Sequence, residues 1–165
     1  MTPLPVQHCF DPVTRPDTRL ILLGSLPGRK SLEQGQYYAH PQNQFWRLIG
    51  AVIGRDLVAL DYDRRLEALL AAHVGLWDTV ASARRAGSLD AQIKLEAASD
   101  LLALIARCPA LRAIGFNGGT AARIGRRQLP MPLEIDLVDL PSSSPAYTVA
   151  FEAKRDRWMA LRTYL

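Results

Sequence analysis

The side chains with the most varied chemistry stand at residues 37 to 46, in the run Tyr-Tyr-Ala-His-Pro-Gln-Asn-Gln-Phe-Trp. An aromatic ring such as Tyr38 can stack on a flat ligand, and an amide such as Asn43 can hold a ring edge or a water molecule. The same residues have structural uses, since tyrosines often fill a core and asparagine often caps a helix. His40 stands before Pro41 and is interpreted as a structural histidine bonded to the backbone.

A turn with two glycines precedes this run, Gly24-Ser25-Leu26-Pro27-Gly28, followed by Arg29, Lys30 and Ser31. Its free backbone N–H groups suit an anion or the edge of a flat ring. A phosphate loop needs four residues between its glycines and a lysine directly after the second, whereas three intervene here and an arginine follows. The sequence therefore disfavours a nucleotide triphosphatase.

Two further segments combine polar side chains with residues that turn the chain. Asn117 is followed by two glycines, which permit close approach of a ligand, although a tight turn explains them equally well. Ser142, Ser143 and Ser144 lie between two prolines, and their hydroxyl and N–H groups suit a phosphate, although serine and proline also simply form loops.

Acidic and metal-binding residues give weaker signals. Asp78 and Asp139 stand near the ends of predicted strands, where capping or a salt link is the expected role of each. Cys9 and Cys108 are far apart and lack metal-ligand spacing, so both are expected to be reduced thiols, with neither a metal nor a cofactor. An arginine pair at residues 84–85 could contact a phosphate, but it is expected to lie in a solvated loop.

Four short apolar runs, at residues 19–24, 74–77, 111–116 and 133–140, predict buried strands. Helical spacing follows in residues 45–53, 66–70 and 101–105 and in the C-terminal stretch 149–164. Ser99 or Asp100 would cap the third helix and Pro109 would end it. Right-handed crossovers then predict an α/β three-layer sandwich, a mainly parallel sheet of about four strands flanked by helices, with ligands at the carboxyl ends of the strands.

The composition fits one domain with its own core, since 48% of the 165 residues are hydrophobic. Residues 1–17 contain four prolines and are expected to form an extended arm. A net charge of +4 slightly favours a polyanionic partner. No apolar run approaches the roughly 18 residues of a membrane helix, and a signal-peptide pattern is absent, so we expect a cytoplasmic protein without a membrane partner.

Four motifs, GSLPG, YYAHPQNQFW, FNGGTA and LPSSSPA, occur in this order between residues 20 and 160. In sequence and spacing they resemble the hypoxanthine-DNA glycosylases, a branch of the uracil-DNA glycosylase superfamily. The chain is more distantly similar to the mismatch-specific uracil-DNA glycosylases, whose water-positioning asparagine falls on Leu26 here. The serine loop also lacks the histidine with which the main uracil-excising enzymes stabilise the departing base.

The resemblance implies a monofunctional enzyme that removes a deaminated base from DNA in base excision repair. Asn43 matches the functional asparagine of the hypoxanthine branch and would hold the attacking water. The flipped base would stack on Tyr38, while residues 25–28 and Asn117 read its edge. Phosphate contacts are expected from Ser142, Ser143, Ser144, Arg29 and Lys30, with residues 146–147 as a wedge.

Two alternatives stay open at this point. The first is a uracil or mismatch-uracil glycosylase, against which Leu26 and the missing histidine count. The second is a DNA-binding protein that kept the fold and lost the chemistry. Retained affinity for DNA without an abasic product would identify the second.

Overall fold

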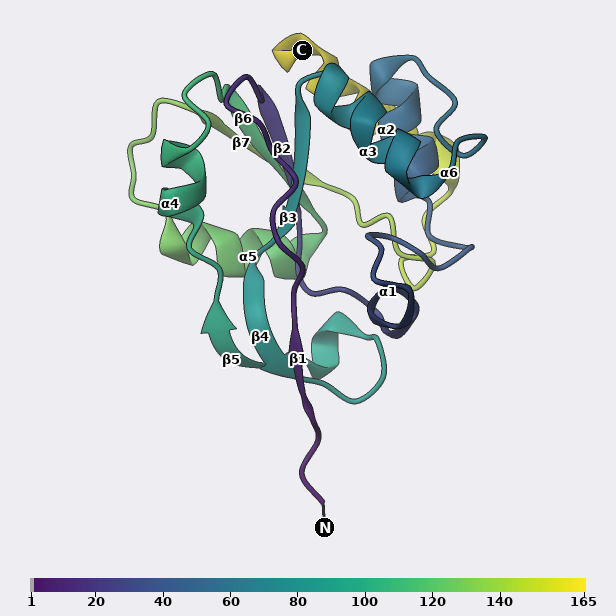
Figure 1. Cartoon of the computed structure of the whole chain (residues 1–165), viewed down its shortest axis with the longest axis vertical. Helices are drawn as coiled ribbons and strands as arrows, with labels where there is room; N and C mark the ends of the chain where they lie inside the picture. The colour runs from purple at the N-terminus through teal and green to yellow at the C-terminus, as the bar shows by residue number, and fades with distance from the viewer. Residues whose placement is uncertain (1) are drawn as a thin grey trace.

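The structure is a computed structural model that describes residues 2–165. Its main sheet contains β2 (Leu20–Gly24), β3 (Val74–Asp78), β6 (Ala113–Asn117) and β7 (Asp136–Leu140). The strands run in the order β3-β2-β6-β7, and every neighbouring pair is parallel. Helices lie on both sides of this sheet (Figure 1). The predicted four-stranded parallel α/β sandwich is therefore confirmed.

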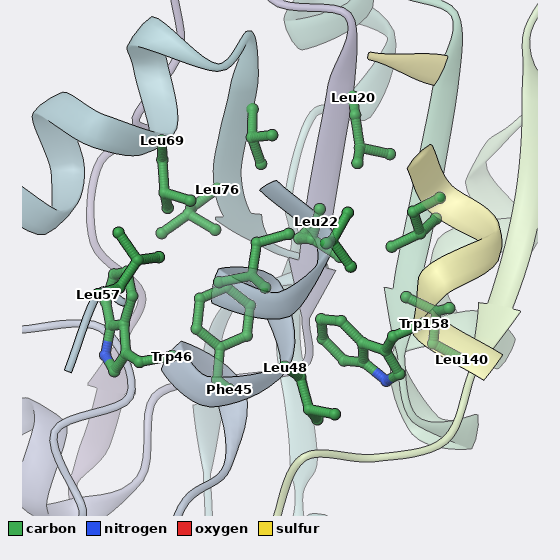
Figure 2. Packing of buried hydrophobic residues seen from close by; sticks show 14 of the residues in the cluster. Leu20, Leu22, Phe45, Trp46, Leu48, Leu57, Leu69, Leu76, Leu140 and Trp158 are labelled. Atoms are coloured by element: carbon green, nitrogen blue, oxygen red, sulfur yellow. The ribbon is translucent and has the colours of Figure 1, made fainter. Parts of the chain in front are cut away.

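Successive residues of β2 point to opposite faces of the sheet and enter two separate cores. Leu20 and Leu22 pack against α2 (Phe45–Ile53), α3 (Tyr62–Ala71) and α6 (Phe151–Trp158), where Figure 2 shows Phe45 and Trp158 beside them. Ile21 and Leu23 pack on the other face against α4 (Leu101–Ala106) and α5 (Gly119–Gln128). Each face buries leucine, isoleucine and aromatic side chains, whose removal from water stabilises the sandwich.

The helix ends follow the expected capping chemistry. Asp100, and not Ser99, caps α4, because its side chain accepts a hydrogen bond from the Ala103 N–H at 3.0 Å. The helix ends at Ala106, three residues before Pro109. The C-terminal stretch differs from the prediction, since α6 stops at Trp158 and continues as a 3₁₀-helix, η2 (Met159–Tyr164). The tighter turn still buries Leu161 in the core.

A second, three-stranded sheet was not predicted. It pairs β1 (Val6–His8) with β4 (Val80–Arg84), and β4 with β5 (Lys94–Ala98), both antiparallel. Every residue of β5 is exposed, so this strand lacks the apolar run that marks a buried one. The expectation of a loop at residues 84–85 is wrong for Arg84, which belongs to β4.

Two short helices were also missed. The helix α1 (Arg29–Gln34) follows the glycine turn, and the 3₁₀-helix η1 (Asp90–Gln92) lies between β4 and β5. Both are too short to display a helical period in the sequence. The strand β7 begins at Asp136 and not at residue 133, because Leu133 and Ile135 reach the α4–α5 core from an irregular segment.

The carboxyl ends of the parallel strands meet at one edge. Gly24 of β2 lies opposite Asp78 of β3, and Asn117 of β6 lies opposite Leu140 of β7. Within the described residues, no helix is long and apolar enough to cross a lipid bilayer. The segments rich in polar and glycine residues therefore begin together at this edge of the sheet.

Candidate active site

A cleft of about 780 Å³ opens at the carboxyl edge of the main sheet. Four segments surround it: the turn after β2, the tyrosine segment before α2, the glycines after β6 and the serine loop after β7. The residues predicted to form the site all line this cleft, namely Gly24, Ser25, Leu26, Pro27, Gly28, Arg29, Lys30, Tyr38, Asn43, Asn117, Ser142, Ser143 and Ser144. Segments separated by more than 100 residues thus share one cavity.

The turn after β2 is held from outside by the connection between β4 and β5. Ser25 Oγ donates a hydrogen bond to Asp90 Oδ1 at 2.6 Å, and the Arg29 N–H donates to Ser88 Oγ at 2.9 Å. Residues 88–91, which we call the cap segment, also line the cleft. The cap segment is a part of the site that sequence reasoning missed, because its contacts join residues about 60 positions apart.

Arg85 contacts the cap segment from the interior of the protein. The expectation that this arginine is solvated is wrong. The residue is 2% exposed. Its guanidinium donates a hydrogen bond to the Pro27 carbonyl and lies 3.8 Å from Asp90 Oδ1. Arg85 therefore joins the turn after β2 to the cap segment. Its guanidinium is buried and engaged in these contacts, so it is not placed to bind a phosphate.

Tyr38 is placed by two contacts that immobilise its ring. The ring stacks on Phe45 with a centroid distance of 3.9 Å and an angle of 14° between the planes. Its hydroxyl accepts a hydrogen bond from Asn117 Nδ2 at 3.3 Å. Burial, and then the nearby Asp78, raise the pKa of Tyr38, so the hydroxyl stays neutral. Tyr38 lines the cleft, whereas Phe45 is wholly buried behind it.

Asn43 lies directly before α2, at the edge of the cleft, where it has the structural role that the sequence allowed and is placed to take the other. Its Oδ1 accepts a hydrogen bond from the Phe45 N–H at 3.0 Å, which holds the first turn of the helix. The residue is half-buried and lines the cleft. A carbonyl oxygen has two lone pairs, so Oδ1 has capacity for a further donor. His40 is exposed and accepts a hydrogen bond from the Gln42 N–H through Nδ1.

Asn117 joins the serine loop to the rest of the site. Its Oδ1 accepts from the Ser143 N–H at 2.8 Å, and its Nδ2 donates to Ser143 Oγ at 2.8 Å. With the bond to Tyr38, both polar atoms of this amide already have partners inside the protein. The geometry therefore makes Asn117 an organiser of the cleft. Both hydrogens of its Nδ2 are engaged within the protein, whereas its Oδ1 accepts one hydrogen bond and has capacity for a further donor.

The serine loop is divided between a buried centre and exposed flanks. Ser143 is wholly buried, so it is not placed to meet a phosphate as expected. Ser142 and Ser144 are half-buried, and their hydroxyls accept N–H bonds from residues 144 and 146 within the loop. Arg29, Lys30 and Tyr147 also line the cleft, and all three residues are exposed.

Two buried residues of α6 hold the serine loop against α2. Lys154 is 1% exposed and donates hydrogen bonds to Gln44 Oε1 at 3.0 Å and to the Ser144 carbonyl at 3.3 Å. Burial lowers the pKa of Lys154. Trp158 Nε1 donates to the Pro141 carbonyl at 3.0 Å. The loop is thus fixed to the start of α2, which Asn43 directly precedes in the chain.

Asp78 differs from the role expected of it. The predicted salt link is present for Asp139, whose Oδ1 lies 2.9 Å from Arg126 Nη2. Asp78 is 3% exposed, and its Oδ2 has no hydrogen-bond partner among residues 2–165. Burial, helped by the negative charge of Asp90, raises the pKa of Asp78 to about 7, and Arg85 offsets only part of this. Asp78 lines the cleft.

Within residues 2–165, no group of His, Cys, Asp and Glu side chains is arranged to hold a metal ion. Cys9 and Cys108 are both free thiols. The cleft therefore offers neutral amides, hydroxyls, backbone groups, an aromatic ring and one buried carboxyl. Such a set can bind a flat polar ring, hold a water molecule and stabilise developing charge.

The fold and this cleft match a known class of proteins. The model of the family described as "Uracil DNA glycosylase superfamily" matches residues 12–164. The chain therefore belongs to the uracil DNA glycosylase superfamily, as the sequence motifs indicated.

Individual relatives resemble the chain over nearly its whole length. A hypoxanthine DNA glycosylase of Methanosarcina barkeri is 38% identical over 149 residues, which cover 90% of this chain and 93% of the relative. A hypoxanthine DNA glycosylase of Methanosarcina acetivorans is 35% identical, with 94% and 98% covered. A solution NMR structure of a candidate uracil DNA glycosylase from Methanosarcina acetivorans superposes with a TM-score of 0.85 at 34% identity, covering 96% of this chain and 97% of that one.

Proposed function

We propose that this protein is a monofunctional DNA glycosylase that removes hypoxanthine from DNA and leaves an abasic site. Its superfamily and its two relatives named hypoxanthine DNA glycosylase support an enzyme that hydrolyses an N-glycosyl bond in DNA. The single observation that carries the proposal is the meeting of Tyr38, Asn43 and the turn after β2 in one cleft. Because hypoxanthine is deaminated adenine, the reaction belongs to base excision repair.

The chemistry needs no charged nucleophile. Breaking the bond between sugar and base leaves positive charge on the sugar and negative charge on the base, so a placed water and hydrogen bonds to the base suffice. Asn43 Oδ1 would hold the water while it keeps the Phe45 N–H bond. The flipped base would lie against Tyr38, whose ring is held rigid by Phe45.

The turn after β2 favours a base other than uracil. Leu26 is 6% exposed and apolar, so it cannot hold a water molecule where the mismatch-specific enzymes carry asparagine. The serine loop offers Ser142 and Ser144 at the cleft and no histidine to stabilise a uracil anion. Both features leave the water to Asn43 and support hypoxanthine as the substrate.

DNA would approach across the cleft mouth. Exposed Arg29 and Lys30 follow the turn after β2, and Ser142, Ser144 and exposed Tyr147 belong to the serine loop and its end; all of them line the cleft. Cations and loop hydroxyls bind phosphates without regard to sequence, and Tyr147 could occupy the space that the flipped base leaves. We expect the enzyme to act in the cytoplasm, at the nucleoid.

Strand cleavage after alkali tests the proposal, with labelled duplexes that contain hypoxanthine, uracil, xanthine or only normal bases. We expect cutting at hypoxanthine and a loss of about 100-fold or more in Asn43→Ala, since one lost group that serves the transition state costs about this much. Gln42→Ala is the matched control, because Gln42 is an exposed neighbouring amide.

The other outcomes distinguish the alternatives. Cutting mainly at uracil would assign the protein to a uracil-excising branch. Folded wild-type protein that binds DNA and yields no abasic product would make it a binding protein. Equal rates in Asn43→Ala and the wild type would remove Asn43 from the mechanism while leaving the glycosylase function intact.

A further inference from the structure

Among the described residues that line the cleft, only Asp78 has a buried polar side-chain atom without a hydrogen-bond partner. Buried side-chain oxygen or nitrogen atoms without partners occur within residues 2–165 in Gln7, Trp46, Asp78, Thr79, Arg85 and Ser99. Of these residues, only Asp78 lines the cleft. An unpaired buried carboxyl costs folding free energy, so a protein that keeps one at a ligand cavity has a use for it.

The backbone of the turn after β2 makes room for this carboxyl. A Cβ atom at Gly24 would lie 2.6 Å from Asp78 Oδ1 and 2.9 Å from the Tyr38 hydroxyl oxygen. Any side chain at position 24 would therefore displace both groups. Glycine here brings the carboxyl, the Tyr38 hydroxyl and the turn that would hold the base to the same point.

We propose that Asp78 is a further catalytic residue: its protonated carboxyl donates a hydrogen bond to the departing base and stabilises the negative charge that the base acquires. The inference rests on the proposed glycosylase function. It assigns to a carboxyl group of β3 the task of stabilising the leaving base, for which the serine loop has no histidine.

The bonds of the reaction balance without consuming the proton of Asp78. The bond between the sugar C1′ and the base nitrogen breaks, and its electron pair leaves with the base. A water oxygen adds to C1′, and the proton that this water releases ends on the departed base through solvent. Asp78 keeps its proton throughout, and its hydrogen bond strengthens as negative charge builds on the acceptor.

The surroundings of Asp78 keep it protonated near neutral pH. The groups close enough to interact with its charge are Asp90, Arg85, Tyr37, Tyr38 and Cys9. Arg85 alone among them carries positive charge, and it is shared with Asp90 at 3.8 Å. Burial therefore dominates and leaves the pKa of the carboxyl at about 7, so the donor form is abundant at pH 6 and scarce at pH 8.

Single-turnover excision of hypoxanthine from duplex DNA between pH 5.5 and 9 tests the inference with two variants. The wild-type rate should fall as the pH rises through about 7. Asp78→Asn keeps a hydrogen-bond donor that cannot ionise, so at pH 6 it should stay within about tenfold of the wild type and show no such fall. Asp78→Ala should lose about 100-fold at pH 6, as expected for one donor at a developing anion.

The matched control is Asp139→Asn, because Asp139 also lies in a strand of the same sheet but is paired with Arg126 away from the cleft. A wild-type excision rate in Asp78→Ala, or the same fall in rate with pH in Asp78→Asn as in the wild type, would overturn this inference and leave the proposed function intact. If Asp78→Ala does not fold, the pH profile of Asp78→Asn decides by itself. Absence of excision by the wild type would overturn the proposed function and this inference with it.

Discussion

Asp78 is the last residue of β3 and Asn117 is the last residue of β6, two strands of the same parallel sheet. Both residues are almost fully buried. The amide of Asn117 has a protein partner for each of its polar atoms, Ser143 on both and Tyr38 on one. The carboxyl of Asp78 leaves Oδ2 without a partner in the described residues. From this difference we expect Asn117 to maintain the shape of the cleft and Asp78 to be available to a ligand.

The largest expected effect concerns the stability of Asp78→Asn at alkaline pH. The pKa of Asp78 is raised in the folded state from 3.8 to about 7, so the native protein holds a proton that the unfolded chain releases. The cost of burying this group is absent at the lowest pH, grows as the pH rises and is complete above about pH 7. Because a tenfold change in an acid dissociation constant corresponds to roughly 1.4 kcal/mol, the variant should gain several kcal/mol at pH 8.

Urea unfolding of the wild type and Asp78→Asn at pH 5, 6.5 and 8 measures this gain. The difference in the free energy of unfolding should increase with pH, while Asp139→Asn should show no such increase. An identical difference at all three values would mean that Asp78 has a partner in the folded protein, and the contrast with Asn117 would disappear.

The second largest effect is expected for Asn117→Ala, which should lower the free energy of unfolding, whereas Asp78→Asn should raise it. Removing this amide leaves the Ser143 N–H buried without an acceptor and releases the Tyr38 hydroxyl. We expect a loss of about 2–3 kcal/mol in the free energy of unfolding, together with a lower excision rate. Ser143→Ala should cost less, and the double variant should cost less than the sum of the two, because the residues share their bonds. Additive losses would contradict the organising role.

Lys154→Met tests a third buried polar residue, which lies behind the serine loop and, like Asn117, has its partners within the protein. The lysine joins Gln44 to the Ser144 carbonyl, so its loss should loosen the serine loop against α2. We expect a loss of about 1–2 kcal/mol and a lower excision rate at unchanged base preference. Thermal unfolding and single-turnover rates measure both quantities. Arg155→Met, an exposed change on the same helix, should alter neither.

The smallest effects are expected from the exposed cations at the cleft mouth. Arg29→Ala and Lys30→Ala should each weaken binding to any duplex by a few-fold, and each should reduce the slope of log K against log salt by roughly one. Fluorescence anisotropy with undamaged duplexes at several salt concentrations measures the slope. Arg64→Ala is the control, since Arg64 is exposed on α3 and does not line the cleft. An unchanged slope would remove the two residues from the DNA contact surface.

The sequence predicted the main sheet because its central strands, β2 and β6, are buried throughout and appear as continuous apolar runs, as in Leu20 to Leu23. It also predicted which segments would meet, because carboxyl ends of parallel strands share an edge. The small sheet was missed since β1 has only three residues and β5 is exposed throughout. Apolar periodicity is a property of buried faces, so edge strands in water leave little of it.

The contacts that decide individual roles could not be predicted in the same way. The bonds from Arg85 to Pro27 and from Ser25 to Asp90 join positions far apart in the chain, and nothing local to Arg85 distinguishes it from a solvated arginine. In the sequence Asp78 resembles an ordinary capping residue. What distinguishes it is that its buried Oδ2 has no hydrogen-bond partner in the described residues, and a sequence does not show this. Both roles depend on packing between distant segments.

The cap segment has an evolutionary consequence. It belongs to the connection between two strands of the small sheet, while the groups that would act on the sugar and the base extend from the main sheet and from the segment that precedes α2. Ser88 and Asp90 of this segment accept hydrogen bonds from the turn after β2, so the position of the turn depends on residues 88–91. A change in residues 88–91 would therefore reshape the turn that would hold the base while leaving the strands of the main sheet in place, so the range of bases accepted could change without a change in the sheet itself.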